Sequence, residues 1–189
     1  MQSVSTFVFL DLPASTMKTL EIRRHSIRSP SGDHLNQSGV TLARLVGQNM
    51  GPFDRVVTSI IPRAFETAIA MGFAVDEQSE LMNTYGSAVE KEAPWPQSVN
   101  NYAEIIKQEG AAARYAKRLM KYYSSIMDFI SEGRSALVIT HGGVVELGVI
   151  GCLPEHDFSS WSDSAGYCEG ARLYWDDKFI RAEELRVNQ

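Results

Sequence analysis

Residues 136–140 constrain the fold of this chain more than any other segment, because they form an almost continuous apolar run, ALVIT. A strand without polar alternation is typical of the middle of a parallel sheet that helices cover on both faces. Gly142 and Gly143 follow closely, and residues 144–150 then have the spacing of a helix. This segment therefore favours an α/β fold, in which strands and helices alternate along the chain.

The other segments show the same alternation, with apolar residues at period two in strands and at helical spacing in helices. Strands are predicted at residues 19–24, 53–59, 171–175 and 179–185, and helices at residues 36–50, 62–71, 98–109 and 111–130. Pro62 suits the first turn of a helix, and Gly72 suits its end. The last two strands form a hairpin around Asp176 and Asp177. We predict a three-layer α/β/α sandwich with a mostly parallel central sheet.

The helix over residues 111–130 has the clearest pattern. Apolar side chains at helical spacing predict a buried stripe made of Ala112, Tyr115, Ala116, Leu119, Tyr123, Ile126 and Ile130. Basic residues gather on the opposite face, at positions 114, 117, 118 and 121. A solvated helix face explains them more simply than a docking site for an acidic partner does.

Length and charge limit the domain count and the classes of partner. The chain has 189 residues, enough for one domain, and no repeat or low-complexity tract divides it. We predict a single domain over residues 1–189, with residues 1–17 as an N-terminal extension. A net charge of -5 and a pI near 5.4 argue against a surface that binds nucleic acid or an anionic membrane. A small, locally basic pocket for an anion remains compatible with that charge.

Cysteine and histidine spacing excludes two further classes of protein. Two cysteines, Cys152 and Cys168, are too few for a disulfide framework and are expected to be buried or half-buried thiols. The four histidines show no metal-binding spacing, so we expect no metal and no cofactor. Residues 1–17 lack the basic start and long apolar run of a signal peptide, and Thr140, His141 and Glu146 interrupt the apolar stretch 136–153. We therefore expect a cytoplasmic protein that does not span a membrane.

Histidines and arginines follow three of the predicted strands. Arg24, His25 and Arg28 come at or after the first strand, Arg63 follows the second, and His141 follows the apolar strand. Because the carboxyl ends of parallel strands meet at one edge of a sheet, these side chains are expected to share one crevice. Arginine forks bind phosphate oxygens, and nearby positive charge keeps a histidine neutral and nucleophilic. The pattern therefore indicates phosphoryl chemistry without a metal.

These segments resemble the histidine phosphatase superfamily, which has the phosphoglycerate mutase-like fold. The matching segments, in the order expected for that superfamily, are IRRHS (22–26), LNQSGVTLARLVG (35–47), VVTSIIPRAFETA (56–68) and LVITHGG (137–143). Together they cover most of residues 19–150. The short chain and the His141-Gly142 pair point to the compact branch of the superfamily.

The resemblance implies a role for each matching residue. His25 would be the nucleophile that becomes phosphohistidine, and Arg24 and Arg63 would grip the phosphoryl group. His141 would donate to a phosphate oxygen, and Arg28 matches a second arginine found in the larger phosphatases and phytases. Residues 77–101 would form the insertion that covers the substrate.

Three departures from the superfamily pattern concern the site. Ser26 replaces a glycine, so either its hydroxyl joins the phosphate pocket or the local backbone is altered. Arg23 replaces an apolar residue and is expected to point to solvent. The general acid has no clear match, because Asn83 lies nearest the expected glutamate position. Glu80 is the first candidate for this acid, with Glu90 and Glu92 behind it.

The leading hypothesis is a metal-independent phosphatase for a phosphomonoester or phosphohistidine substrate. Its substrate would be a small phosphorylated compound or a phosphoprotein, and inorganic phosphate would be its product. One alternative is phosphoryl transfer of the phosphoglycerate mutase type. The other is a degenerate module that binds a phosphorylated ligand without catalysis, which the missing acid and Ser26 suggest.

Overall fold

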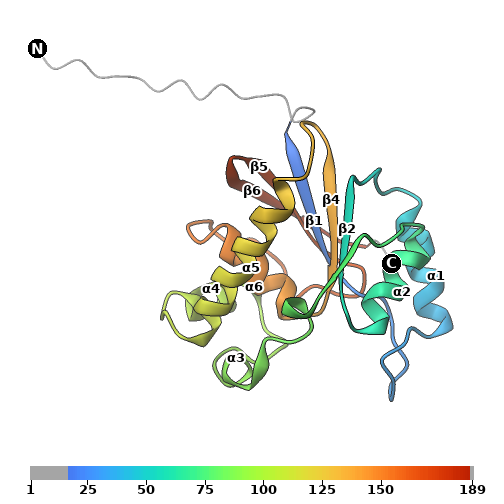
Figure 1. Cartoon of the computed structure of the whole chain (residues 1–189). Helices are drawn as coiled ribbons and strands as arrows, with labels where there is room; N and C mark the ends of the chain where they lie inside the picture. The colour runs from blue at the N-terminus through green and yellow to red at the C-terminus, as the bar shows by residue number, and fades with distance from the viewer. Residues whose placement is uncertain (1–16, 188–189) are drawn as a thin grey trace, which may run out of the picture.

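A computed structural model describes residues 17–187 of the chain. It contains a six-stranded sheet in the order β3-β2-β4-β1-β5-β6 (Figure 1). The strands are β1 (Lys18–Arg24), β2 (Arg55–Ser59), β3 (Glu77–Ser79), β4 (Ser135–Thr140), β5 (Gly170–Asp176) and β6 (Lys178–Leu185). The predicted N-terminal extension lies outside the described residues, apart from Met17.

The strand directions divide the sheet into two parts. The pairs β3-β2, β2-β4 and β4-β1 are parallel, whereas β1-β5 and β5-β6 are antiparallel. The parallel sheet is therefore confirmed for the first four strands, and the predicted hairpin is confirmed for the last two. Parallel strands place their carboxyl ends at one edge, so β1, β2 and β4 end on the same side of the molecule.

Helices lie on both sides of this sheet (Figure 1). They are α1 (Gln37–Gly47), α2 (Pro62–Met71), α3 (Gly86–Glu92), α4 (Val99–Ile106), α5 (Ala111–Met127) and α6 (Val144–Cys152), with a short 3-10 helix, η1 (Glu80–Met82). Helices α1 and α2 lie to one side, and α4, α5 and α6 lie to the other. The molecule is a mixed α/β protein.

The alternation of side chains along the strands produces two separate apolar cores. In β4, Val138 belongs to the core beneath α5 and α6, whereas Leu137 and Ile139 belong to the core beneath α1 and α2. The predicted stripe of α5 is confirmed, since all seven of its residues are buried. Burying both faces of β4 explains why this strand carries almost no polar residues.

Local sequence signals explain where two helices begin and end. The side chain of Asn36 accepts a hydrogen bond of 2.8 Å from the Gly39 N–H and caps α1. Pro62 occupies the first turn of α2, and Gly72 ends that helix in the left-handed conformation, with φ of 96°. Pro62 marks where α2 starts, which matters because Arg63 lies in its first turn.

Residues 77–101 differ from the simple cover predicted for them. They contain β3, η1, α3 and the start of α4. Strand β3 is an edge strand of the sheet. Its sequence, EQS, has no apolar residue and only three positions, so apolar periodicity cannot predict it. The first three residues of this segment therefore belong to the sheet, and the remaining residues lie outside it.

Arg23 corrects one prediction, because it points inward and not to solvent. Its side chain is buried, its Nε donates to Glu21 Oε2 at 2.9 Å, and its guanidinium also donates to the Cys168 carbonyl at 2.9 Å. Glu21 also accepts from Arg172 on the neighbouring strand β5. Arg23 and Glu21 lie two residues apart on one face of β1, so the pairing of their charges makes the burial possible.

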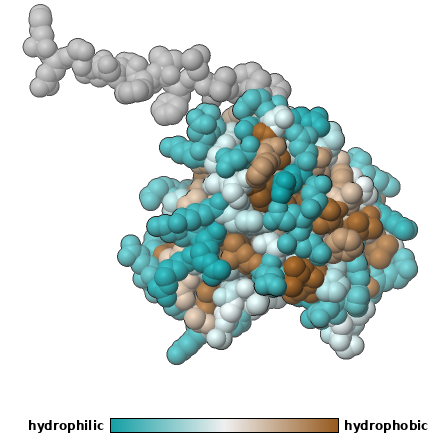
Figure 2. All heavy atoms as spheres, viewed as in Figure 1, coloured by the Kyte–Doolittle hydropathy of each residue, from teal (hydrophilic) through white to brown (hydrophobic). Residues whose placement is uncertain are grey.

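The predicted burial of both thiols is confirmed: Cys152 and Cys168 are buried and free. Within residues 17–187, no helix has the length and apolar character needed to cross a membrane. The face of the molecule shown in Figure 2 is mostly hydrophilic, with apolar residues gathered in a few places.

Candidate active site

Adjacent strands bring the two predicted histidines together. Arg24 of β1 lies opposite Thr140 of β4, and the His25 N–H donates to the Thr140 carbonyl at 2.8 Å. Each histidine is the next residue after its strand, so both leave the sheet at the same edge. Their ring centroids lie 5.1 Å apart. The expected meeting of His25 and His141 at the strand ends is confirmed.

One nitrogen of the His25 ring donates a hydrogen bond, and the other accepts one. Its Nδ1 lies 2.7 Å from the Ser26 carbonyl and donates its proton to it. Its Nε2 therefore carries a lone pair, which accepts a hydrogen bond of 3.1 Å from the Arg63 Nε–H. Burial, and then the charges of Arg63, Arg24 and Arg28, lower the pKa of His25 to about 3. The ring is neutral near pH 7, as a nucleophile requires.

His141 is held from the end of β2. Its Nε2 lies 2.7 Å from the Ser59 Oγ, which itself accepts a hydrogen bond of 3.3 Å from the Ile61 N–H. The arrangement that satisfies these groups has the Ser59 hydroxyl donate to Nε2, which leaves the proton of His141 on Nδ1. Burial and the nearby His25, Arg63 and Arg24 lower the pKa of His141 to about 3. His141 is therefore a neutral donor at neutral pH.

Arg24 is clamped by two aromatic rings and a carbonyl. Its Cζ lies 4.6 Å from the ring centroid of Trp95 and 4.3 Å from that of Tyr167. One terminal nitrogen donates to the Ala165 carbonyl at 3.1 Å. Burial lowers the pKa of Arg24, but an arginine keeps its charge at neutral pH. The aromatic faces and the carbonyl fix the guanidinium in place.

Three buried nitrogen atoms at this site lack a hydrogen-bond partner among the described residues. They are the Nε of Arg24, the Nε1 of Trp95 and the Nδ1 of His141. A buried donor without a partner costs about 1–3 kcal/mol. Three such donors around neighbouring residues have the chemistry of a site for an anion, because each requires an acceptor.

Two further arginines add positive charge at the edge of the site. Arg63 donates from Nε to His25 and from a terminal nitrogen to Asp33 at 2.8 Å. Arg28 is exposed and donates to carbonyl groups of its own loop, at Ser29, Pro30 and Gly32. It nevertheless lies close enough to lower the pKa values of Arg24 and Arg63. The structure thus brings Arg24 and Arg63 to the two histidines, whereas Arg28 lies at the edge of the site and acts on His25 only through its charge.

Solved structures with the same arrangement of strands and helices identify the fold. A phosphoserine phosphatase from Entamoeba histolytica, in complex with 3-phosphoglyceric acid, superposes with a TM-score of 0.64 at 15% identity, covering 92% of this chain and 98% of that chain. A phosphoglycerate mutase from Bacillus anthracis has a TM-score of 0.60 at 17% identity, covering 91% and 94%. A mycobacterial glucosyl-3-phosphoglycerate phosphatase has a TM-score of 0.57 at 18% identity, covering 88% and 96%. The chain has the fold of the histidine phosphatase superfamily. No protein-family model matches it, and no curated protein sequence does.

Within this histidine phosphatase fold, Ser26 does not face the pocket. Its Oγ donates to the Gly39 carbonyl at 2.8 Å, and its N–H donates to the Thr67 Oγ1 at 2.9 Å. The residue is fully buried between β1 and helices α1 and α2. Ser26 therefore positions the backbone beside His25, and its predicted role as a phosphate ligand is wrong, because its hydroxyl is already used.

The three candidate acids lie in different surroundings. Glu92 accepts from the Ala111 and Ala112 N–H groups at 2.9 and 3.0 Å, so it caps α5. Glu90 lies beside Tyr85, and burial and then the hydrogen bond to Glu90 raise the pKa of that tyrosine. Glu80 begins η1 and is exposed, and within residues 17–187 no hydrogen bond or ion pair joins its carboxylate to the histidines or arginines. Its role as the acid stays a prediction.

Sequence reasoning missed Glu146, which supports the site from behind. This buried carboxylate accepts from the Gly143 N–H at 2.6 Å and from the Ala165 N–H at 2.8 Å. It therefore joins the turn after His141 to the residue whose carbonyl holds Arg24. Burial raises the pKa of Glu146. A single carboxylate inside an otherwise apolar helix was the available signal.

In the described part of the chain, no group of three or more His, Cys, Asp or Glu residues is placed to hold a metal ion.

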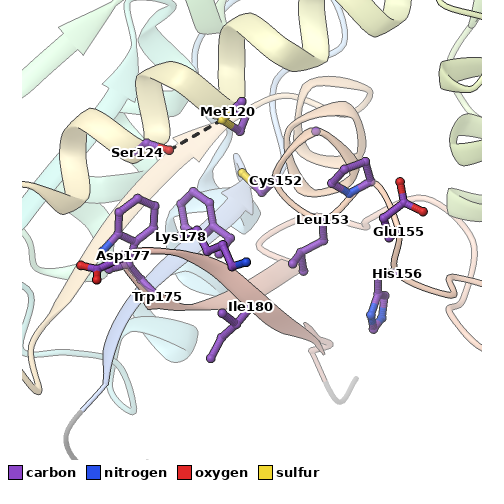
Figure 3. Close-up of a pocket in the computed structure, with 13 residues that line it drawn as sticks. Met120, Ser124, Cys152, Leu153, Glu155, His156, Trp175, Asp177, Lys178 and Ile180 are labelled. Atoms are coloured by element: carbon purple, nitrogen blue, oxygen red, sulfur yellow. Dashed lines mark hydrogen bonds between the residues drawn. The ribbon is translucent and has the colours of Figure 1, made fainter. Parts of the chain in front are cut away.

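A groove of about 810 Å³ runs beside α5 and the β5–β6 hairpin (Figure 3). Cys152, Leu153 and Trp175 line it, together with ten other residues, and none of the predicted site residues is among them.

Proposed function

We propose that this chain is a metal-independent phosphatase that acts through a phosphohistidine intermediate on His25. The observation that carries the proposal is the neutral His25 ring, whose Nε2 lone pair lies next to Arg63 and whose pocket contains three unpartnered buried N–H groups. Its substrate would be a phosphomonoester or phosphohistidine, on a small compound or on a protein. Inorganic phosphate would be its product.

The first step would transfer the phosphoryl group to the protein. The Nε2 of His25 attacks phosphorus, the new N–P bond forms, and the bond from phosphorus to the leaving group breaks. The leaving group keeps that electron pair and takes up a proton, from Glu80 if this residue is the acid. Arg24 and Arg63 stabilise the negative charge of the transferred oxygens.

The second step would release the phosphate. A water molecule attacks phosphorus, a P–O bond forms, and the N–P bond to His25 breaks. Inorganic phosphate leaves with the oxygen of that water, one proton passes to solvent, and His25 returns to its neutral state. In this step the hydrogen bond from Nδ1 to the Ser26 carbonyl keeps the ring in the same orientation.

Similar proteins support phosphoryl chemistry on this fold, but their names give different substrates and so do not indicate the substrate of this chain. The names of two of them describe phosphatases, for phosphoserine and for glucosyl-3-phosphoglycerate, and the name of another describes a phosphoglycerate mutase. The mutase is the second candidate for this chain. Exchange of phosphate between 2- and 3-phosphoglycerate would separate it from a phosphatase.

The decisive experiment compares two histidine variants. We expect His25→Ala to lower turnover of an aryl phosphate by at least a thousandfold, because the variant has no atom to accept the phosphoryl group. His34→Ala is the matched control: His34 is exposed and bonded to Glu66, and its loss should change the rate less than twofold. A chelator should also leave the wild-type rate unchanged. Full activity of His25→Ala would rule out the mechanism.

A further inference from the structure

Trp95 belongs to the segment between α3 and α4, yet its side chain lies inside the candidate active site. One face of its ring covers the Arg24 guanidinium at 4.6 Å. The edge that carries Nε1 lies beside Gly142, because a Cβ atom added at Gly142 would come within 2.5 Å of that nitrogen. The indole N–H is therefore placed between Arg24 and the turn that follows His141.

The chain contains three tryptophans, and Trp95 differs from the other two. Trp161 packs on Phe158 with ring centroids 5.2 Å apart, and Trp175 packs on Phe179 at 4.8 Å. Neither of them stacks on a residue of the site. The Nε1 of Trp95 is buried and, among the described residues, has no acceptor, whereas the other two indole nitrogens are not in this state.

An indole N–H can only donate, so burial of Nε1 in this place favours a ligand that supplies an acceptor oxygen. The Nε of Arg24 and the Nδ1 of His141 share that requirement. A phosphoryl group presents three non-bridging oxygens, and the site presents three N–H donors.

We propose that Trp95 is a substrate-binding residue of the site, whose indole N–H donates to a phosphoryl oxygen while its ring holds the Arg24 guanidinium in orientation. This inference rests on the proposed function in one respect: both require that an anion binds in the pocket. It assigns to residues 77–101 a direct part in binding the phosphoryl group, in addition to any contact with the rest of the substrate.

Binding of inorganic phosphate tests the proposal without requiring turnover. Calorimetry should give a dissociation constant about tenfold higher for Trp95→Phe than for the wild-type protein, because phenylalanine keeps the ring but loses the donor. Trp95→Leu should weaken binding further and also lower kcat, since Arg24 loses one of its two aromatic faces. Trp161→Phe, the matched control, should bind phosphate as the wild-type protein does.

A spectroscopic readout on the unsubstituted protein keeps the test valid even if Trp95→Phe does not fold. Of the three indole N–H signals in a ¹⁵N-labelled sample, only the signal of Trp95 should move on titration with phosphate. Trp161→Phe and Trp175→Phe would assign the other two signals by their disappearance.

The outcomes separate this inference from the proposed function. If the wild-type protein binds phosphate and hydrolyses an aryl phosphate, but no indole signal moves and Trp95→Phe binds equally well, the role of Trp95 is wrong and the phosphatase stands. If phosphate binds and moves the Trp95 signal but no substrate is hydrolysed, the binding role stands and the proposed activity is wrong. If phosphate does not bind to the wild-type protein, the role of Trp95 is wrong, and hydrolysis of the aryl phosphate alone decides the proposed activity.

Discussion

The two histidines show how burial selects a protonation state. Both are at least nine-tenths buried, and both lie among positive charges, so their imidazolium forms lose hydration without gaining a counter-ion. The pKa of each is lowered to about 3. That both rings stay neutral down to acidic pH follows directly from their buried places at the strand ends.

The lowered pKa values of His25 and His141 have a measurable effect on the free energy of unfolding. Below pH 6.5, the ordinary histidine pKa, the unfolded chain binds protons that the folded chain does not bind, so the free energy of unfolding falls as pH falls towards 3. Each buried histidine adds a slope of about 1.4 kcal/mol per pH unit. Urea unfolding between pH 6 and 4.5 should therefore show a shallower loss of stability for His25→Asn than for the wild-type protein.

The control for this experiment is His34→Asn. His34 is exposed, and its bond to Glu66 raises its pKa, which is the opposite sign. Its removal should not flatten the pH dependence. Equal slopes for His25→Asn and the wild-type protein would show that His25 is not held neutral.

Glu80 can be tested through the leaving group. If it is the acid, Glu80→Gln should slow hydrolysis of an alkyl phosphate by about a hundredfold, because an alkoxide leaves poorly without a proton. Hydrolysis of an aryl phosphate, whose leaving group is stable as an anion, should change only a few-fold. Glu104→Gln, at an exposed carboxylate paired with Lys107, is the control. Unchanged alkyl phosphate turnover would exclude Glu80 as the acid.

At the scale of elements, the turn from β4 into α6 organises the pocket. It carries His141, and its two glycines allow aromatic rings from residues 77–101 to approach the backbone. Gly143 has φ of 81°, a conformation that suits glycine. Glu146, in the first turn of α6, accepts from the Gly143 N–H and fixes the turn. Tyr85 and Trp95 can thus approach this turn because Gly142 and Gly143 have no side chains.

Gly142→Ala should expel the Trp95 indole, since the new methyl group would lie 2.5 Å from the ring. We expect a loss of about 1–3 kcal/mol in the free energy of unfolding, typical of overpacking, and a fall in kcat/KM of at least tenfold. Adding Trp95→Ala to this variant should recover stability but not activity. Gly32→Ala, where space for a methyl group exists, is the control. A stable, active Gly142→Ala variant would contradict this packing.

At the scale of the molecule, an ion cluster joins the two parts of the sheet. Glu21 on β1 accepts from Arg23 and from Arg172 on β5, and Arg172 also donates to Glu183 on β6. Glu21 is only 3% exposed, so its charge depends on both arginines. The cluster ties the antiparallel hairpin to the strand that precedes His25.

Arg23→Ala should remove one partner of a buried carboxylate and lower the free energy of unfolding by about 3 kcal/mol. Urea denaturation measures this change. Arg44→Ala, at an exposed position of α1, should change it by less than 0.5 kcal/mol. A similar small effect at Arg23 would show that the cluster contributes little.

The sequence predicts those strands and helices whose apolar residues recur at a regular spacing. Apolar periodicity locates the central strands, and their ends then locate His25, His141 and Arg63. Trp95 and Tyr167 lie in segments without periodicity, so only the tertiary structure brings them to Arg24. The predicted role of Ser26 was wrong because successive side chains of an extended backbone point to opposite sides, so Ser26 points away from the side that His25 faces. Arg23 misled because Cys168, whose carbonyl accepts a hydrogen bond from it, lies near the other end of the chain.

The order of the strands has a consequence for how this protein folds. Strand β1 lies between β4 and β5, with Thr19 opposite Ser135 and Tyr174, so its neighbours emerge from the ribosome more than a hundred residues later. Pairings of such sequence separation form slowly, because a long loop must close before any contact rewards it. The nascent chain therefore presents His25 to solvent long before His141 and the last strands exist to enclose it.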